Sequence, residues 1–324
     1  KKTTRVKYSD MTIRRKTGAA NRKVQKLMNL MNMETVHVAW DFLKENGLKA
    51  LILKSKHKIQ GIDDDYDYAE WWNLTKPSEE ELEEQKKKKF GYMPKFSIVI
   101  PVYKTPEKFL REMLDSIVEQ TYANWELCIA DGSPAGESVE TVLKKYAEKD
   151  ARIRYQVLGE NRGISGNTNA ALEMAEGDFI VLADHDDRLT PNALFECAKK
   201  LNENENCDVL YSDEDKLDMD GDELFDPHFK PDFNPDLLTS VNYICHLFVV
   251  KKELLDKVGG FRAEYDGAQD YDFIFRCTEN AKQICHIPKV LYHWRCHPNS
   301  TASNPESKLY AFTAGSRAIM DHYK

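Results

Sequence analysis

The sequence gathers acidic side chains at one point, the segment ADHDD (183–187), which directly follows the apolar run FIVL. Asp184 and Asp186 lie one residue apart where a buried strand is expected to end, so both carboxylates can face one hard cation such as Mg²⁺ or Mn²⁺. The alternative is a turn or helix-cap cluster, since Asp favours both. Like charges packed at the end of a buried strand repel each other, however, and a turn gains nothing from that. The spacing therefore favours a metal site.

Two further segments could contact a nucleotide. WELCIAD (125–131) predicts a strand that ends in Asp131, whose carboxylate could accept from a ribose or a base, although an ordinary Asp-Gly turn explains it equally well. ENRGISGN (160–167) is rich in small and amide residues before a helix, which permits close backbone approach and favours negative charge. It matches no dinucleotide or ATP phosphate loop, so hydride transfer and ATP hydrolysis lose their main support.

A third group of acids lies in GGFRAEYDGAQDYDFIFR (259–276), where Asp270 and Asp272 begin a helical pattern. A carboxylate at a helix N-terminus has a plain role as a cap, which suits Asp266 or Asp272. It can also act as a base that takes a proton from an incoming hydroxyl. Both interpretations of this segment stay open on the residues alone.

The basic and sulfur-containing residues are less informative. His293, in LYHWR (291–295), follows a short apolar strand and taken alone is a structural residue, since Cys296 and His297 offer too few ligands for zinc. Seven scattered cysteines without a Cys-x-x-Cys pair favour buried free thiols in a reducing compartment. Three basic residues are expected to form exposed salt bridges rather than to bind phosphate: Lys216, Lys230 and Arg295.

The elements that must position these groups alternate between strands and helices. Apolar runs predict strands over 96–103, 125–131, 152–159 and 178–184, and helical periodicity falls over 108–120, 138–150 and 165–177. This order indicates an α/β fold with a parallel sheet, in which ligands bind at the carboxyl ends of the strands. The later runs 208–215, 242–250 and 285–294 are expected to continue the same domain.

Composition limits the remaining possibilities. The chain has 324 residues, 41% of them hydrophobic, and no apolar run approaches the roughly 18 residues of a transmembrane helix. Residues 1–95 hold 21 Lys and Arg against 14 Asp and Glu, whereas the remainder holds 25 against 40. An acidic remainder is a poor binder of phosphate backbones, so we expect no nucleic-acid partner.

We expect a helical accessory region or linker over 1–90 and a catalytic domain over 91–324. Within the latter, a nucleotide-binding half would cover about 94–187, an acceptor half about 188–305, and a C-terminal helix 306–324. The basic start also suits a peripheral contact with an anionic membrane surface. Because the chain starts at Lys1, we expect it to belong to a longer protein that could hold further domains.

The motifs together, in their order along the chain, resemble family 2 glycosyltransferases of the GT-A fold, a Rossmann-like, mostly parallel sheet flanked by helices. The likeness is strongest to bacterial enzymes that build O-antigen, rhamnan-type and other surface polysaccharides. It covers about residues 94–320 and includes, besides the motifs above, YSDEDK (211–216), FKPD (229–232), NPDLL (234–238), NYI (242–244) and GAQDYD (267–272).

The resemblance implies roles for individual residues. Those expected to contact the nucleotide are Pro101, Val102, Tyr103, Asp131, Arg162, Gly163, Asp184 and His185. Those expected to hold the metal are Asp184, Asp186 and His293, and Asp270 matches the base. One departure is Gln269, which stands where many members have Glu and leaves deprotonation to Asp270 alone; His185 replaces a residue that is commonly small.

The implied reaction is an inverting, Mn²⁺- or Mg²⁺-dependent transfer of sugar from a UDP- or dTDP-sugar to a hydroxyl of a growing surface polysaccharide or lipid-linked glycan. It is expected in the cytoplasm, at the inner face of the cell membrane. One alternative is a sugar nucleotidyltransferase, although no glycine-rich Lys/Arg loop follows the first strand. Another is an inactive glycan-binding or scaffold module, against which the intact set of acids argues.

Overall fold

The computed structural model describes residues 68–296 and 309–324. The chain divides into two compact units, Lys1–Trp71 and Trp72–Lys324, and the fold below is that of the second. The basic start, for which we predict a membrane contact, lies outside the described residues, as does most of the predicted accessory region. None of the described helices has the length and apolar composition needed to cross a membrane.

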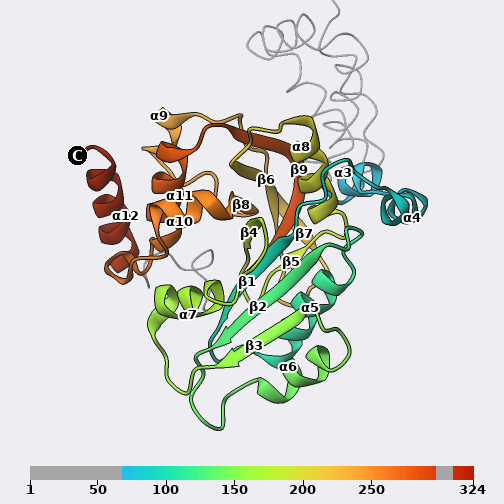
Figure 1. Ribbon diagram of the computed structural model, residues 1–324, viewed down its shortest axis with the longest axis horizontal. Helices are drawn as coiled ribbons and strands as arrows, with labels where there is room; N and C mark the ends of the chain where they lie inside the picture. Colours follow the sequence, from blue (N-terminus) through green and yellow to red (C-terminus); the bar gives the residue numbers. More distant parts are fainter. Residues whose placement is uncertain (1–67, 297–308) are drawn as a thin grey trace, which may run out of the picture. The chain divides into compact units, whose positions relative to one another are not determined.

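One sheet organises the second unit (Figure 1). Its strands are β1 (Phe96–Val102), β2 (Trp125–Asp131), β3 (Ile153–Val157), β4 (Phe179–Leu182), β5 (Arg188–Leu189), β6 (Val209–Leu217), β7 (Leu224–His228), β8 (Phe248–Lys251) and β9 (Ile284–Arg295). Their order is β3-β2-β1-β4-β8-β6-β9-β5, and β7 pairs with β6. The first four strands in this order are parallel, whereas β8 runs antiparallel to both β4 and β6.

Helices cover both faces of the sheet (Figure 1). The described helices are α3 (Tyr68–Thr75), α4 (Glu79–Lys87), α5 (Glu107–Val118), α6 (Glu140–Ala147), α7 (Gly163–Leu172), α8 (Ala193–Glu203), α9 (Pro235–Leu238), α10 (Lys252–Val258), α11 (Gln269–Asn280) and α12 (Leu309–His322), with a 3₁₀ turn at Ala263–Tyr265. Alternate residues of β1 point to opposite faces: Ile98 and Ile100 pack with α5, α6 and α8, and Val99 packs with α7, α10 and α11. The sheet is therefore buried on both sides, as its continuous apolar strands predict.

The parallel strands end at one edge, which brings Pro101, Asp131 and Asp184 to the same side of the sheet. Only the last part of the run 242–250 forms a strand. β8 starts at Phe248, which pairs with Leu182, the last residue of β4. Continuing this antiparallel register brings His246, two residues before Phe248, opposite Asp184, two residues after Leu182. The loop before β8 thus crosses the end of β4.

The opposite edge of the sheet has its own buried acid, Glu126 at the start of β2. Its carboxylate accepts hydrogen bonds from Ser97 Oγ at 2.5 Å and Glu176 N at 2.6 Å, and it pairs with Lys95 Nζ at 2.6 Å and Arg154 Nη2 at 2.8 Å. Burial opposes ionisation, yet these partners hold the pKa of Glu126 below its ordinary value. The acid fastens the loop before β4 to β1 and β2.

We predict that Glu126→Ala lowers the free energy of unfolding by about 2–3 kcal/mol, because two buried hydrogen bonds and two cations lose their acceptor. Urea denaturation measures it. Glu176→Ala is the matched control, since Glu176 pairs with the same Lys95 and Arg154 from a side chain that is 66% exposed, and it should cost under about 1 kcal/mol. Because the pKa is lowered on folding, the difference should shrink as the pH falls below the ordinary glutamate pKa. Equal losses in the two variants would contradict this.

Candidate active site

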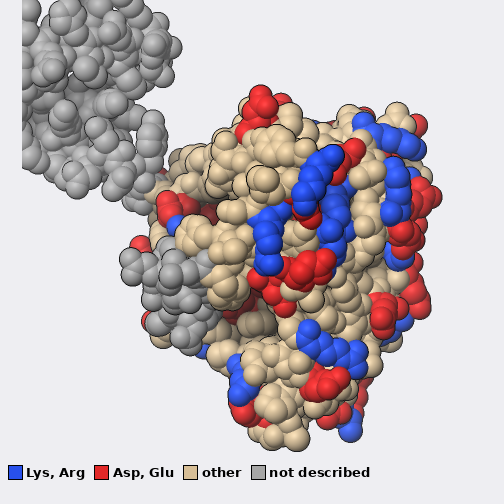
Figure 2. All heavy atoms as spheres, turned by 90° about the vertical axis from the view of Figure 1, so that its left-hand side faces the viewer, with Lys and Arg blue, Asp and Glu red and all other residues tan. Residues whose placement is uncertain are grey.

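A cavity of about 530 Å³ lies at the carboxyl ends of β1 and β4. Its polar wall brings together side chains from separate segments of the chain: Asp184, Asn242, His246 and Asp270. Apolar side chains from α7, the loop before β8 and α12 form the remaining wall, among them Ile164, Val241 and Phe312. On the face that holds α7 and α12, basic side chains lie next to acidic ones over an otherwise uncharged surface (Figure 2). The cavity thus combines a polar end with an apolar side.

The polar end contains a group of potential metal ligands formed by Asp184, Asp187 and His246, with one ligand atom from each within 4.8 Å of the others. His246 Nε2 lies 3.5 Å from Asp184 Oδ2, and the imidazole stacks on the ring of Tyr292 at 4.6 Å. Burial favours the neutral ring, but the contact with Asp184 and the charges of Asp184 and Asp187 raise the pKa of His246 to about 9. The imidazole is therefore an effective counter-charge to the acids.

Asp187 is buried and held by two donors from β9. The hydroxyl of Tyr292 donates to its Oδ2 at 2.6 Å, and the backbone N–H of Arg295 donates to its Oδ1 at 2.7 Å. The same hydroxyl accepts from Asp184 N at 3.0 Å. Burial, followed by the negative charges of Asp186 and Asp184, raises the pKa of Asp187 well above its ordinary value. Tyr292 thus joins the two ends of the acidic segment.

Lys230 and Glu214 hold His246 in place. The Lys230 ammonium is fully buried, where it donates to Glu214 Oε2 at 3.1 Å, to the carbonyl of Ile244 at 2.7 Å and to the carbonyl of His246. Glu214 Oε2 also accepts from His246 N at 3.2 Å. The motifs YSDEDK and FKPD therefore act together to fix the loop that carries the imidazole. The expectation of an exposed salt bridge for Lys230 is wrong, because its backbone partners lie in the core.

Asp270 reaches the cavity from the first turn of α11. The amide of Asn242 donates to its Oδ2 at 2.9 Å, which fixes the orientation of the carboxylate. Burial raises the pKa of Asp270, and this effect is opposed by the charge of His246 and the backbone N–H of Tyr271. A carboxylate with a raised pKa is a stronger base once it is ionised.

The residues predicted to contact a nucleotide after the first strand lie in different environments. Pro101 lines the cavity, Val102 is fully buried in the core, and Tyr103 is exposed. Asp131 is fully buried and accepts from Ser133 N at 2.9 Å, Ser138 Oγ at 2.6 Å and Val139 N at 3.2 Å. These bonds to its own loop satisfy the carboxylate, so a bond from Asp131 to a base requires that the loop release a donor.

The turn before α7 meets an acid from the loop before α11. Gly163 has φ +76°, and a Cβ at this position would come within 2.7 Å of Asp266 Oδ2. Asp266 accepts from Ser165 N at 3.3 Å and from Ser165 Oγ at 2.5 Å, so its carboxylate occupies the N-terminus of α7. Arg162 points its guanidinium toward Glu160 at 3.5 Å.

The remaining predicted residues are His185, Asp186 and His293. His185 Nδ1 lies 3.6 Å from Asp186 Oδ1. His293 Nδ1 lies 2.5 Å from Asp215 Oδ1, and the ring meets the ring of Trp72 edge-on. The group of ligand atoms found among the described residues thus contains Asp187 and His246, where the resemblance implies Asp186 and His293. His246 was visible in the segment NYICHLFVV (242–250) as a candidate ligand. The sequence did not reveal the antiparallel pairing of β8 with β4 that places its imidazole beside Asp184.

Comparison with known proteins identifies the family of this chain. Residues 97–259, about half of the chain, match the profile described as glycosyl transferase family 2.

The chain belongs to glycosyl transferase family 2.

Several relatives are similar to this chain over most of its length. It is 44% identical over 231 residues to the uncharacterized protein y4gI of Sinorhizobium fredii and 36% identical over 256 residues to the O-antigen biosynthesis protein RfbC of Myxococcus xanthus. These alignments cover 71% and 79% of the chain but only 25% and 20% of those proteins. The chain thus spans a quarter or less of the length of these relatives. It is also 30% identical to the uncharacterized glycosyltransferase MJ1057 of Methanocaldococcus jannaschii, with coverage of 68% of the chain and 77% of that protein.

Solved structures share the fold. The crystal structure of Staphylococcus aureus TarS 1–349 in complex with UDP matches with a TM-score of 0.55 at 24% identity, over 70% of the chain and 65% of that structure. The mannosyltransferase PcManGT from Pyrobaculum calidifontis, in complex with GDP-Man and Mn²⁺, matches with a TM-score of 0.51 at 20% identity, over 75% and 68%. The predicted GT-A fold is confirmed for this glycosyltransferase.

For this glycosyltransferase we predict that Tyr292→Phe lowers the free energy of unfolding by about 1–3 kcal/mol, because buried Asp187 loses a hydrogen-bond donor and Asp184 N loses an acceptor. Urea denaturation at neutral pH measures the change. Tyr323→Phe on α12, where the side chain is 67% exposed, controls for the loss of a hydroxyl and should change stability by less than about 0.5 kcal/mol. A Tyr292→Phe protein as stable as the control would show that the hydroxyl does not support the acids.

Proposed function

We propose that this chain transfers a sugar, with inversion, from a UDP- or dTDP-sugar to a hydroxyl of a growing surface polysaccharide or lipid-linked glycan. The observation that carries the proposal is that Asp184, His246 and Asp270 line one cavity, and that Asp184 and His246 form a group of potential metal ligands together with buried Asp187. The relative named for O-antigen biosynthesis supports the acceptor class, and the complexes of TarS with UDP and of PcManGT with GDP-Man support a nucleotide-sugar donor. The reaction would take place at the cytoplasmic face of the membrane.

The donor atoms at the end of β4 fit a divalent cation. Two carboxylates and one imidazole within 4.8 Å form a set that Mn²⁺ accepts and that Mg²⁺ accepts less readily because of the nitrogen ligand. A cation bound there supplies positive charge that stabilises a departing diphosphate. Asp184, Asp187 and His246 would hold it, and the imidazole would give up the proton that its raised pKa favours, because only the neutral ring binds a metal. Asp186 and His293, which the resemblance implies, are the competing assignment for the second carboxylate and the imidazole.

Asp270 is the proposed base. Its carboxylate takes the proton of the acceptor hydroxyl while the acceptor oxygen bonds to the anomeric carbon, and the bond from that carbon to the diphosphate oxygen breaks with its electrons leaving on the diphosphate. Asn242 fixes one carboxylate oxygen during this step. One base and one displacement invert the anomeric centre, so the chemistry needs no second carboxylate paired with Asp270.

We predict that Asp270→Asn lowers kcat by roughly 10²–10⁴-fold, because the amide cannot take the acceptor proton. The assay is sugar transfer with donor and Mn²⁺ saturating, and calorimetry should show unchanged binding of UDP. Glu279→Gln, on the same helix α11 but away from the cavity, serves as the control and should retain its activity. Since burial raises the pKa of Asp270, wild-type kcat/KM should fall on acidification at a pH above that of an ordinary aspartate. Near-normal turnover by Asp270→Asn would remove it as the base.

A second prediction separates the two histidines. His246→Gln should raise the Mn²⁺ concentration for half-maximal activity by roughly tenfold or more, because an imidazole ligand is lost. His293→Gln should leave that concentration unchanged, since His293 bonds to Asp215. Mn²⁺ titration by calorimetry checks both variants without turnover. The opposite pattern would favour the ligand set implied by the resemblance, and a wild-type protein without Mn²⁺ binding would contradict the metal site altogether.

A further inference from the structure

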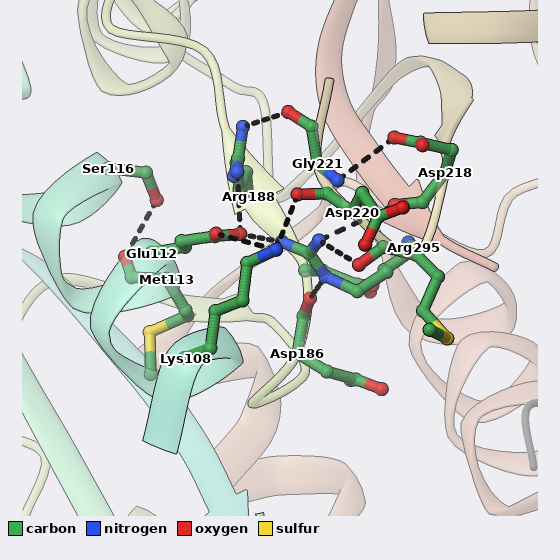
Figure 3. Close-up of polar contacts among 12 residues, drawn as sticks. Lys108, Glu112, Met113, Ser116, Asp186, Arg188, Asp218, Asp220, Gly221 and Arg295 are labelled. Carbon is green, nitrogen blue, oxygen red and sulfur yellow. Dashed lines mark hydrogen bonds and ion pairs between the residues drawn. The ribbon is translucent and has the colours of Figure 1, made fainter. Parts of the chain in front are cut away.

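The acidic segment 184–187 is connected to α5 through a single carboxylate, that of Glu112. Glu112 Oε2 accepts hydrogen bonds from the guanidinium groups of both Arg188 and Arg295, and Lys108 Nζ lies 4.0 Å from its Oε1 (Figure 3). Arg188 directly follows the acidic segment in the chain, and Arg295 ends β9. One acid on a neighbouring helix thus receives two arginines that flank the acidic segment on either side.

Arg295 donates two hydrogen bonds directly to the acidic segment. Its backbone N–H donates to Asp187 Oδ1 at 2.7 Å, and its Nε donates to the backbone carbonyl of Asp186 at 2.6 Å. The contact follows from the sheet, because β5 and β9 pair Arg188 with His293 in antiparallel register and two further steps bring Asp186 opposite Arg295. The expectation that Arg295 forms an exposed salt bridge is therefore wrong: its side chain is fully buried.

The positive charges of Arg188 and Arg295 are balanced by the carboxylate of Glu112. The Arg295 guanidinium rests on the ring of Phe109 at 4.6 Å and has no access to water. Burial opposes ionisation of Glu112, but its hydrogen bond to Arg188 and the charges of both arginines keep its pKa below the ordinary value. A buried guanidinium that loses its carboxylate is strongly destabilised and takes the best remaining acceptor. Arg295 already touches two residues of the acidic segment, Asp186 and Asp187, whose carboxylates would serve.

We propose that Glu112 is a positioning residue: by neutralising Arg188 and Arg295 it keeps both guanidinium groups away from the carboxylates of Asp184, Asp186 and Asp187, so that those of the ligand group, Asp184 and Asp187, stay available to a divalent cation. Glu112 itself contacts neither donor nor cation. The inference rests on the proposed function, and it adds a residue from α5 that lies outside every motif of the sequence analysis.

The test compares Glu112→Gln with Glu107→Gln. Both change one carboxylate of α5 to an amide, but Glu107 pairs with Arg111 on the helix surface and is 62% exposed. Calorimetry measures the Kd for Mn²⁺ of each full-length variant, and steady-state assays give the Mn²⁺ and donor requirements separately from kcat. Glu112→Gln should weaken Mn²⁺ binding by roughly tenfold or more, in the range typical of residues that orient metal ligands, while Glu107→Gln matches wild type. Turnover of Glu112→Gln should approach the wild-type kcat once Mn²⁺ is saturating.

Two further variants keep the proposal open to contradiction if Glu112→Gln folds poorly. Glu112→Asp retains the charge on a shorter side chain and should bind Mn²⁺ with intermediate affinity. Glu112→Gln combined with Arg188→Gln removes one positive charge with the negative one and should recover part of the lost affinity. Unchanged Mn²⁺ affinity in the folded Glu112 variants, with only a lower melting temperature, would reduce Glu112 to a structural residue. A wild-type protein that binds no Mn²⁺ would instead contradict the proposed function, and this inference with it.

Discussion

Mutual repulsion among carboxylates at the end of β4 is the constraint on which the site depends. Asp184, Asp186 and Asp187 lie within four consecutive residues, and burial shields the charge of Asp187 from water. The chain answers with contacts from other segments: an imidazole from the loop before β8, and a hydroxyl and a guanidinium from β9. His246 balances the charge of one carboxylate, and the Arg295 guanidinium is already paired with Glu112, so negative charge remains on the segment. The residual charge is what makes this strand end suited to a cation rather than to a structural ion pair.

A second acidic segment shows the contrast. On β6, Asp213, Glu214 and Asp215 are also buried and consecutive, yet each has its own basic partner: His286 at 2.8 Å, Lys230 at 3.1 Å and His293 at 2.5 Å. Each of these carboxylates therefore has a polar partner of its own, and alternation along a strand keeps neighbouring carboxylates on opposite faces. The acidic segments 184–187 and 213–215 are similar in sequence but therefore have different roles. The acids of β6 hold loops in place, whereas those after β4 face a cavity.

Local patterns were enough to predict the parallel half of the fold and the acids at its strand ends. Continuous apolar runs fix strands such as Phe96–Val102, and the alternation with helices fixes their direction. His246 escaped prediction because the run before β8 looks like a strand throughout, and only its pairing with β4 places the imidazole beside Asp184. The burial of Lys230 and Arg295 was not predicted for a related reason. A lone basic residue is exposed in most proteins, and the sequence does not reveal that backbone carbonyls in the core will accept hydrogen bonds from these side chains.

The predicted division into a nucleotide-binding half and an acceptor half does not separate the residues of the site, because side chains of the second half contact the acids of the first. The acids belong to the first half, near residues 184–187, but three side chains that balance or align them, His246, Tyr292 and Arg295, come from the second half. Their contacts join residues that are more than 60 positions apart, so they exist only when β8 and β9 have joined the sheet. A parallel sheet alone would gather the carboxylates without restraining them. The antiparallel strands turn that cluster into a site with fixed geometry.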